Sequence, residues 1–261
     1  MLLENKVAVV YGAGGAIGGA VARAFAAEGA EVFVTGHRRG AAEHVANDIS
    51  ARGGAATAAE VDALDEQSIE RHLQTVIDTA GRVDISFNAV GLRDTTVLGV
   101  PLTDLAAEQF VFPITAYATS YFLTARLAAR RMVPNGSGVI MTVTALPARK
   151  GTLLNGGYGP SQAVKEAMTR DLSAELAPSG VRVVAIRPHG IPETETMRHS
   201  YETRPPGRTW EQFEDFLAGS THPRRTMRLE EAASVAAFVA SDRASGFTGT
   251  VVNLTMGSLD D

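Results

Sequence analysis

Short runs of hydrophobic residues alternate with amphipathic stretches along most of the chain. The runs are rich in β-branched residues and predict strands at 7–10, 32–35, 55–61, 83–88, 139–144, 181–186 and 250–254. The stretches end at Gly or Pro and predict helices at 17–28, 41–52, 66–80, 115–132, 162–176, 210–217 and 230–240. Strand and helix therefore take turns almost from one end of the sequence to the other.

This alternation predicts an α/β fold in which βαβ units build a parallel sheet. Right-handed crossovers place helices on both faces, so we expect a single Rossmann-type, doubly wound sheet of about seven strands. No linker or internal repeat divides the sequence, and one domain is expected over residues 1–261. The segment at about 191–228 breaks the rhythm with several prolines and one expected helix. An insertion of this length predicts a lid over a ligand site.

Composition narrows the classes of protein that remain. The 261 residues include 24 Lys and Arg against 29 Asp and Glu, a net charge of −5, with 45% hydrophobic residues and no cysteine. These values exclude a disordered chain, a disulfide scaffold and a Cys-ligated metal site, and they disfavour a nucleic-acid binder. No apolar run approaches the ~18 residues of a membrane span. The first residues enter a strand directly, without the pattern of a signal peptide, so a cytoplasmic protein is expected.

A glycine-rich loop joins the first expected strand to the first expected helix. Such a loop needs glycine where the chain turns tightly and where the backbone must approach a pyrophosphate. The helix that follows offers free N–H groups and a partial positive charge to the phosphates. We therefore expect a dinucleotide to bind Gly12, Gly14, Gly15, Ala16, Ile17 and Gly18.

The spacing Gly12-x3-Ala16-x-Gly18 resembles the TGxxxGxG loop of the short-chain dehydrogenases/reductases (SDRs). The resemblance runs through nearly the whole chain: residues 88–91 resemble the family's NNAG, residues 187–190 its PG turn, and residues 246–249 its ITG. It implies that the remaining cofactor contacts are made by Asp62, Asn88, Ala89, Gly91, Pro188, Gly190, Ile191 and Thr194. It also implies a homo-oligomer, a tetramer or dimer, formed through the helices at 115–132 and 162–176.

The end of the second strand bears on the choice of cofactor. In SDRs that prefer NAD, an acidic residue here binds the ribose hydroxyls. This chain has Gly36 instead, followed by His37, Arg38 and Arg39. No acid in this stretch repels a 2′-phosphate and two arginines are available to pair with it, which favours NADP(H) over NAD(H). A solvated basic turn is the alternative.

The resemblance places the family's catalytic tyrosine at Tyr158 and departs from the family around it. In SDRs a lysine four residues later lowers the pKa of this tyrosine. A serine thirteen residues earlier binds the substrate oxygen, and an asparagine on the preceding long helix supports the lysine. The corresponding residues here are Gln162, Ala145 and Tyr117. The resemblance thus keeps one catalytic residue and loses three.

Lys165 and several loop residues are candidates to replace what is missing. The spacing Tyr158-x6-Lys165 resembles that of enoyl-carrier-protein reductases, and positions 158, 162 and 165 share one helix face. Lys165 starts ~4.5 Å further along the helix than residue 162, so it is either a displaced lysine or a residue of the helix surface. His189 is a candidate acid or a solvated loop residue, and the same alternative of loop solvation holds for Arg149 and Lys150.

These observations favour an NADP(H)-dependent oxidoreductase that transfers hydride to a carbonyl or activated alkene of a small molecule, with Tyr158 as proton donor. Tyr158, Gln162 and Lys165 are the expected catalytic positions. Three alternatives remain: a catalytically silent dinucleotide-binding scaffold or sensor, an enoyl-reductase-like enzyme that uses Tyr158 and Lys165, and a non-redox elimination with His189 or Tyr158 as base. No metal ligand is expected.

Overall fold

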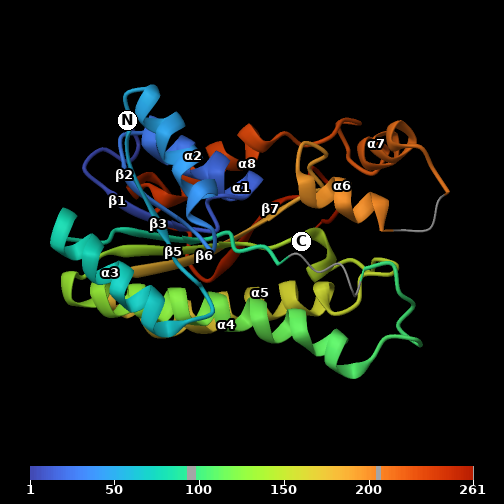
Figure 1. Cartoon of the computed structure of the whole chain (residues 1–261), viewed down its shortest axis with the longest axis horizontal. Coiled ribbons are helices and arrows are strands. Elements are labelled where there is room, and N and C mark those ends of the chain that lie inside the picture. The colour runs from blue at the N-terminus through green and yellow to red at the C-terminus, as the bar shows by residue number, and fades with distance from the viewer. Residues whose placement is uncertain (93–97, 204–206, 261) are drawn as a thin grey trace.

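A parallel sheet of seven strands forms the centre of the computed structural model, which describes residues 1–92, 98–203 and 207–260 (Figure 1). The strand order is β3-β2-β1-β4-β5-β6-β7, so the chain changes direction between β1 and β4. The strands are β1 (Val7–Tyr11), β2 (Glu31–Gly36), β3 (Ala55–Glu60), β4 (Ile85–Asn88), β5 (Gly138–Val143), β6 (Val181–Pro188) and β7 (Thr250–Leu254). The expected doubly wound fold is confirmed, and in such sheets ligands bind at the carboxyl ends of the strands beside this change of direction.

Helices cover both faces of the sheet (Figure 1). One face carries α1 (Ala16–Ala27), α2 (Arg39–Ala51) and α8 (Leu229–Ala240), and the other carries α3 (Glu66–Ala80), α4 (Ala107–Met132) and α5 (Tyr158–Leu176). Each face has its own buried hydrophobic layer, because the strands are buried on both sides and their side chains alternate between the layers.

The helix α4 begins at Ala107, well before the expected start at residue 115. The sequence places Pro113 in this stretch, and proline lacks the N–H that a helix interior uses. The helix nevertheless continues through Pro113, which is buried. A side chain at Gly157 would overlap the carbonyl oxygen of Phe110 and lie 2.9 Å from Cγ of Pro113. Packing of this turn against Gly157 therefore outweighs the local preference of proline.

The segment from residue 191 to 228 contains two helices where the sequence predicted one. The expected helix is α7 (Trp210–Gly219), and α6 (Glu195–Glu202) was missed. The signal for α6 is Thr194, whose side chain accepts a hydrogen bond from the amide of Met197 (3.2 Å) and caps the helix. The ring of Tyr201 on α6 packs against those of Trp210 and Phe213 on α7, so the two helices share one aromatic cluster.

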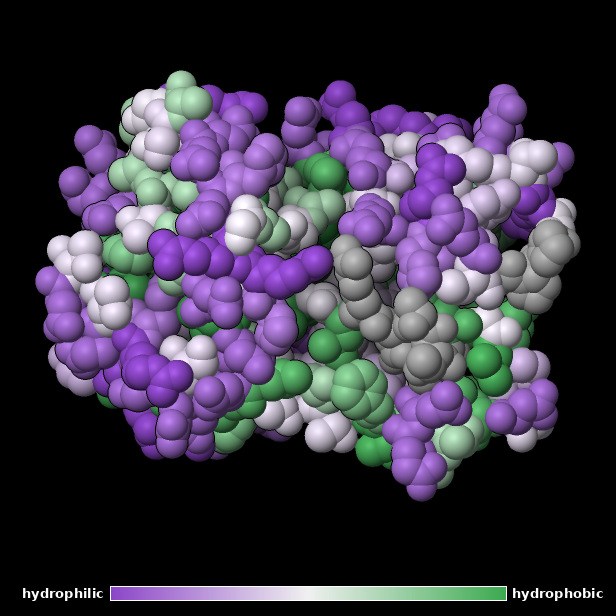
Figure 2. Space-filling model, viewed as in Figure 1, coloured by the Kyte–Doolittle hydropathy of each residue, from purple (hydrophilic) through white to green (hydrophobic). Residues whose placement is uncertain are grey.

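Polar residues dominate the face of the molecule in Figure 2, and hydrophobic residues gather at its lower right, where Figure 1 places the start of α4. Exposed apolar side chains of α4 include Val111, Phe112 and Phe122. Within the described ranges, no helix has both the length and the apolar character that crossing a membrane requires.

His72 on α3 is buried against Phe33 and makes no hydrogen bond through Nδ1 within the described part of the chain. Burial lowers the pKa of His72 from 6.5 to about 4, because the apolar surroundings disfavour the charged ring. Protons then bind the unfolded chain more readily than the folded one. The contribution of neutral His72 to the free energy of unfolding is therefore fully present above pH 6.5. It decreases by up to about 3 kcal/mol as the pH drops toward 4.

We expect His72→Leu to remove this pH dependence. The free energy of unfolding can be measured with urea at a pH above 6.5 and at a pH near 4. In acid, His72→Leu should lose less stability than the parent protein does. The exposed His44 on α2 provides the control, since His44→Leu should leave the pH dependence unchanged. Equal acid sensitivity in His72→Leu and the parent would contradict the assignment.

Candidate active site

The glycine loop lies where β1 and β4 end side by side, with Tyr11 paired to Asn88. Gly12 follows β1 with a φ of 73°, a conformation that favours glycine. A Cβ on Gly12 would lie 2.6 Å from the carbonyl oxygen of Ala89, and one on Gly18 would overlap the carbonyl oxygen of Gly12. The first turn of α1, the loop and the end of β4 therefore touch through bare backbone.

The first turn of α1 fits a phosphate group. Its N-cap is Gly15, which supplies no side-chain hydrogen bond, and the turn contains no acidic residue. The amides at the start of the helix are therefore left for an anion, and the helix dipole favours negative charge there. The residues present fit the pyrophosphate of a dinucleotide. On the protein side, the close approach requires that Gly12 and Gly18 carry no side chain.

The basic turn after β2 is exposed at His37 and Arg38, while Arg39 pairs with Glu43 (2.7 Å). The pairing of β2 with β3 also places Glu60 directly opposite Gly36. Glu60 is exposed, and sequence reasoning missed it because it lies at the end of the neighbouring strand. The strand register, which the sequence does not state, is the only signal that brings this acid to the turn.

The polar residues at the ends of β3 and β4 are held by the protein itself. Asp62 accepts a hydrogen bond from the amide of Leu64 (2.9 Å). Asn88 is buried, and its Nδ2 donates to the hydroxyls of Ser120 and Thr124, both at 3.0 Å. The side chain of Asn88 therefore fixes α4 against the end of β4 and shapes the turn of residues 88–91 that faces Gly12.

His189 is buried at the turn that follows β6, so its interpretation as a solvated loop residue is wrong. Its Nε2 lies 2.9 Å from Oγ of Ser220, at the end of α7. Burial lowers the pKa of His189, and the charge of nearby Lys150 lowers it further, although the Gly190 backbone acts in the opposite sense. Lys150 and Arg149 are exposed, as the solvated alternative expected.

The other residues of this turn contact the helices of the 191–228 segment. A Cβ on Gly190 would come within 3.0 Å of Cε of Met197 on α6 and 3.3 Å of Cδ2 of Leu217 on α7. Ile191 and Thr194 are buried, and the hydroxyl of Thr194 donates to the carbonyl of Ile191 (2.8 Å). Both helices therefore rest on the turn that begins at Pro188.

Tyr158 is the first residue of α5, and its ring packs edge to face against Tyr117 of α4 at 5.9 Å between centroids. The hydroxyl of Tyr117 accepts a hydrogen bond from the amide of Leu92 (3.1 Å). Burial raises the pKa of Tyr158 above its usual value, and Tyr117 raises it further. The phenol of Tyr158 therefore stays protonated at neutral pH.

The two helix positions beyond Tyr158 differ in what they reach. Gln162 is buried, and its Nε2 donates to Oγ of Ser161 (3.1 Å). Lys165 is 1% exposed, so its interpretation as a surface residue is wrong. Its Nζ donates to the carbonyl of Val143 (2.6 Å) rather than to Tyr158, and lies 5.6 Å from the ring centroid of Tyr117. Burial lowers the pKa of Lys165 to about 7.

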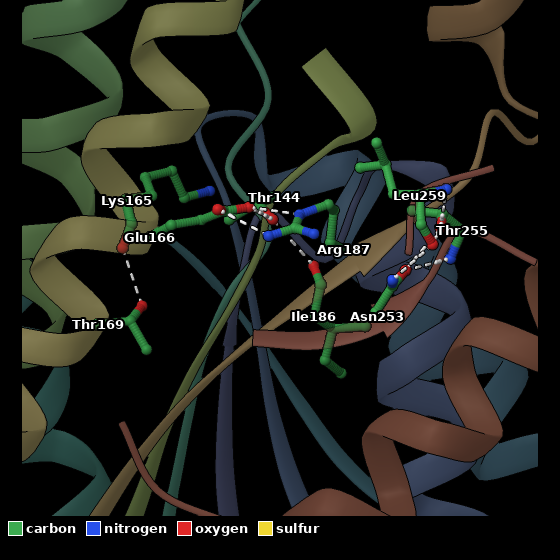
Figure 3. Close-up of polar contacts among 9 residues, drawn as sticks. All are labelled: Thr144, Lys165, Glu166, Thr169, Ile186, Arg187, Asn253, Thr255 and Leu259. Carbon is green, nitrogen blue, oxygen red and sulfur yellow. Dashed lines mark hydrogen bonds and ion pairs between the residues drawn. The ribbon is translucent and has the colours of Figure 1, made fainter. Parts of the chain in front are cut away.

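A buried ion pair lies beside Lys165, and sequence reasoning did not find it. Arg187 at the end of β6 donates from Nε and Nη2 to the two oxygens of Glu166 on α5, at 2.8 and 2.9 Å (Figure 3). Thr144 donates its hydroxyl to the same carboxylate at 3.1 Å. The signal is Arg187 near the end of the largely apolar strand 181–188, because a charge buried in such a strand needs a buried partner.

Within the described ranges, no group of three or more His, Asp or Glu side chains is placed to hold a metal ion. The arrangement instead has a glycine loop that fits a phosphate at the ends of β1 and β4, and a phenol at the start of α5. A loop of the first kind suits a dinucleotide, and a phenol of the second kind suits proton donation to a reacting group.

Comparison with known proteins agrees with this arrangement. The protein family described as "Enoyl-(Acyl carrier protein) reductase" matches residues 12–258. The 7alpha-hydroxysteroid dehydrogenase of Escherichia coli (strain K12) is 29% identical over 261 residues, which cover 99% of this chain and 96% of that protein.

Two solved structures are similar over almost their whole length. The structure of 7 alpha-hydroxysteroid dehydrogenase with NADH and 7-oxo glycochenodeoxycholic acid has a TM-score of 0.87 and 28% identity, covering 99% of this chain and 96% of that one. The structure of NAD+-bound xylitol dehydrogenase has a TM-score of 0.90 and 25% identity, covering 97% of this chain and 99% of that one. Both relatives bind a nicotinamide dinucleotide.

The close approach at Gly18 leads to a stability prediction. We expect Gly18→Ala to lower the free energy of unfolding by about 1–3 kcal/mol, because the new methyl group would force the loop away from α1. Gly40→Ala is the control, since open space surrounds Gly40 in the first turn of α2, and alanine there should be neutral or stabilising. Urea unfolding of both variants checks the contrast, and equal stabilities would refute the steric argument.

Proposed function

The chain belongs to the short-chain dehydrogenase/reductase family, and from this premise we propose that it is an NADP(H)-dependent reductase of a carbonyl group or activated alkene in a small molecule. The observation that carries the proposal is the protonated phenol of Tyr158 at the start of α5, beside the ends of the strands. Reduction needs a proton for the substrate, and a neutral tyrosine can donate one.

We propose that the glycine loop and the first turn of α1 hold the pyrophosphate, and that the turn beginning at Pro188 holds the nicotinamide end. Asp62 and the 88–91 turn complete the contacts expected from the family. The nicotinamide supplies the hydride that the chain's own side chains cannot supply. The contribution of the chain is to bind and orient both reactants and to hold one proton at Oη of Tyr158.

The missing serine and lysine favour one direction of reaction. Without the serine, Ala145 offers no donor to the substrate oxygen, and loss of one such donor typically costs ~10²–10³ in rate. Lys165 donates to Val143 and not to Tyr158, so no lysine contact favours the phenolate that an oxidation would need. A phenol that is hard to ionise harms alcohol oxidation most, and we therefore propose reduction as the working direction.

We propose that the 191–228 segment is the substrate lid of a single domain spanning 1–261. The contacts of Gly190 with Met197 and Leu217 and the His189–Ser220 hydrogen bond support this role. They connect the turn after β6 to both helices of the segment, so a movement of these helices would also move the turn. Residues 204–206 lie outside the described part of this lid.

We further propose a homo-oligomer, a dimer or tetramer, formed through α4 and α5. The exposed apolar side chains of α4, among them Phe112 at 54% and Phe122 at 43%, support an interface on this helix. The absence of cysteine suits a protein of the reducing cytoplasm.

A second candidate function is a dinucleotide-binding scaffold or sensor without turnover. The specific observation that favours it is the combined replacement at Ala145, Gln162 and Tyr117 beside an intact glycine loop. An enoyl-reductase-like activity that uses Lys165 is supported by the burial of that lysine and weakened by its bond to Val143.

The cofactor preference generates a binding prediction. We expect Arg38→Ala to weaken NADPH binding roughly ten- to a hundredfold and to leave NADH binding unchanged, because a charge-assisted contact to the 2′-phosphate is lost. Fluorescence titration of both cofactors measures the change. Arg52→Ala, at the far end of α2, is the control. The preference would be overturned in favour of NAD(H) if the parent bound NADH more tightly than NADPH and Glu60→Gln removed that difference.

The role of Tyr158 generates a kinetic prediction. We expect Tyr158→Phe to lower NADPH-dependent reduction about a hundredfold or more and to leave NADPH affinity unchanged, because only proton donation is removed. A panel of ketones and enoyl thioesters, followed by NADPH absorbance, provides the assay. Tyr121→Phe, a buried tyrosine bonded to Thr169, is the control. Turnover that survives in Tyr158→Phe would exclude it as the acid, and NADPH binding without turnover on the whole panel would favour the scaffold.

A further inference from the structure

Two neighbouring side chains of α5, one basic and one acidic, reach the same strand end without pairing. Nζ of Lys165 binds the carbonyl of Val143, and Oε1 of Glu166 accepts from the hydroxyl of the next residue, Thr144. Figure 3 shows both side chains extending from α5 toward this end of β5. Among the described residues, Lys165 forms no ion pair with Glu166 or with any other carboxylate.

Glu166 is held by a stronger partner. Both of its oxygens bind Arg187, from Nε at 2.8 Å and Nη2 at 2.9 Å, and both side chains are almost fully buried. A planar guanidinium matches a carboxylate at two points, and an ammonium matches it at one. The carboxylate of Glu166, with Thr144 as its third donor, is therefore fixed toward β6 and forms no ion pair with Lys165.

Among the described residues, the other titratable groups near Lys165 are three tyrosines and one arginine. Tyr117 and Tyr121 lie on α4 and Tyr158 lies at one end of α5, and burial raises the pKa of Tyr121 and of Tyr158. From the sheet, β5 contributes a carbonyl and a hydroxyl, and β6 contributes Arg187, whose charge is balanced by Glu166. An amine buried among neutral groups loses its proton more easily than one in water.

We propose that Arg187 is a positioning residue for Lys165: by holding both oxygens of Glu166, it keeps that carboxylate from pairing with the buried amine and lets Lys165 give up its proton inside the protein. The direction and extent of the pKa change at Lys165, to about 7 by burial, support this role. The arrangement depends on the contacts of Glu166, since a carboxylate released toward the amine would hold it as an ammonium.

The proton on Lys165 matters to the site through Tyr117. The amine lies 5.6 Å from the ring centroid of Tyr117, and the same ring packs against Tyr158. An ammonium here favours a phenolate at Tyr158 and a neutral amine does not. This consequence rests on the proposed function: when Tyr158 gives its proton to substrate, a charged Lys165 adds long-range stabilisation to the phenolate without contacting Tyr158.

The chain contains three lysines, Lys6, Lys150 and Lys165, which makes the charge state directly measurable. Protein labelled with carbon-13 at the lysine ε position gives three resonances, and Lys165→Met identifies the one from Lys165. Titration of the free protein should show Lys165 changing charge near neutral pH and the two others at more alkaline pH. No cofactor or substrate is needed, so the result is independent of the proposed oxidoreductase activity.

Two single variants should move this titration in opposite directions. Arg187→Met frees Glu166 and should raise the midpoint of Lys165 by about one pH unit or more. Glu166→Gln removes the carboxylate that binds Arg187 and should lower the midpoint of Lys165. The double variant Glu166→Gln with Arg187→Met removes both charges and should return the midpoint close to that of the parent. Arg131→Met, which breaks a surface pair with Glu70, is the control and should shift nothing.

A midpoint for Lys165 that is unchanged in both single variants, or that moves the same way in both, would overturn the proposal. Breaking one side of a buried pair costs several kcal/mol, so Arg187→Met has a substitute if it does not fold. Arg187→Lys keeps the charge but lacks the planar fork, and it should raise the midpoint by a smaller amount. A shift of this kind together with no reductase activity would retain the role of Arg187 and reject the proposed function.

Discussion

The contact between the end of β1 and the end of β4 is the constraint on which the rest of the structure depends. Gly12 and Ala89 meet there through bare backbone, and Gly18 brings the first turn of α1 onto the same point. A side chain at either glycine would separate the strands' ends from the helix. Asn88 secures the opposite side of this contact by bonding two hydroxyls of α4. One close approach therefore aligns the loop, the helix that faces it and the helix across the sheet.

Much of the fold and part of the candidate site follow from local pattern in the sequence. The periodicity of hydrophobic residues predicts the parallel sheet, because each strand and helix is buried in a regular way. The glycine spacing predicts the loop, because only glycine allows the backbone of the loop to approach α1 and the end of β4 so closely. The start of α4, the helix α6 and the burial of Lys165 did not follow. Pro113 is tolerated only because Gly157 receives it. Contacts between distant segments decide the start of α4 and the burial of Lys165, which leave no local signal in the sequence, whereas α6 has its capping residue Thr194 as a local signal.

The ion pair between Glu166 and Arg187 shows the same limit in its electrostatic form. Arg187 in a largely apolar strand indicates that a buried partner is needed, but Glu166 is identified as that partner only when α5 is laid on the end of β6. A buried pair of this kind gains little net stability over apolar residues, because desolvation offsets the attraction. Its value here is orientation: two donors from Arg187 on β6 and one from Thr144, just after β5, fix one carboxylate of α5, and the helix that carries Tyr158 is thereby fixed against the sheet.

The replacements around Tyr158 change the electrostatics of the site in one consistent direction. On the proposed correspondence with the family, Ala145 stands in place of a hydroxyl and Gln162 in place of a charge, and the ring of Tyr117 packs against Tyr158, so we infer less polar surroundings for the phenol. Each change raises the cost of a negative charge on Tyr158, and none raises the cost of the neutral phenol. A site altered in this way can still give up a proton that a substrate anion takes from it. It is poorly suited to start a reaction by ionising the tyrosine, because that step places the charge where the surroundings resist it most.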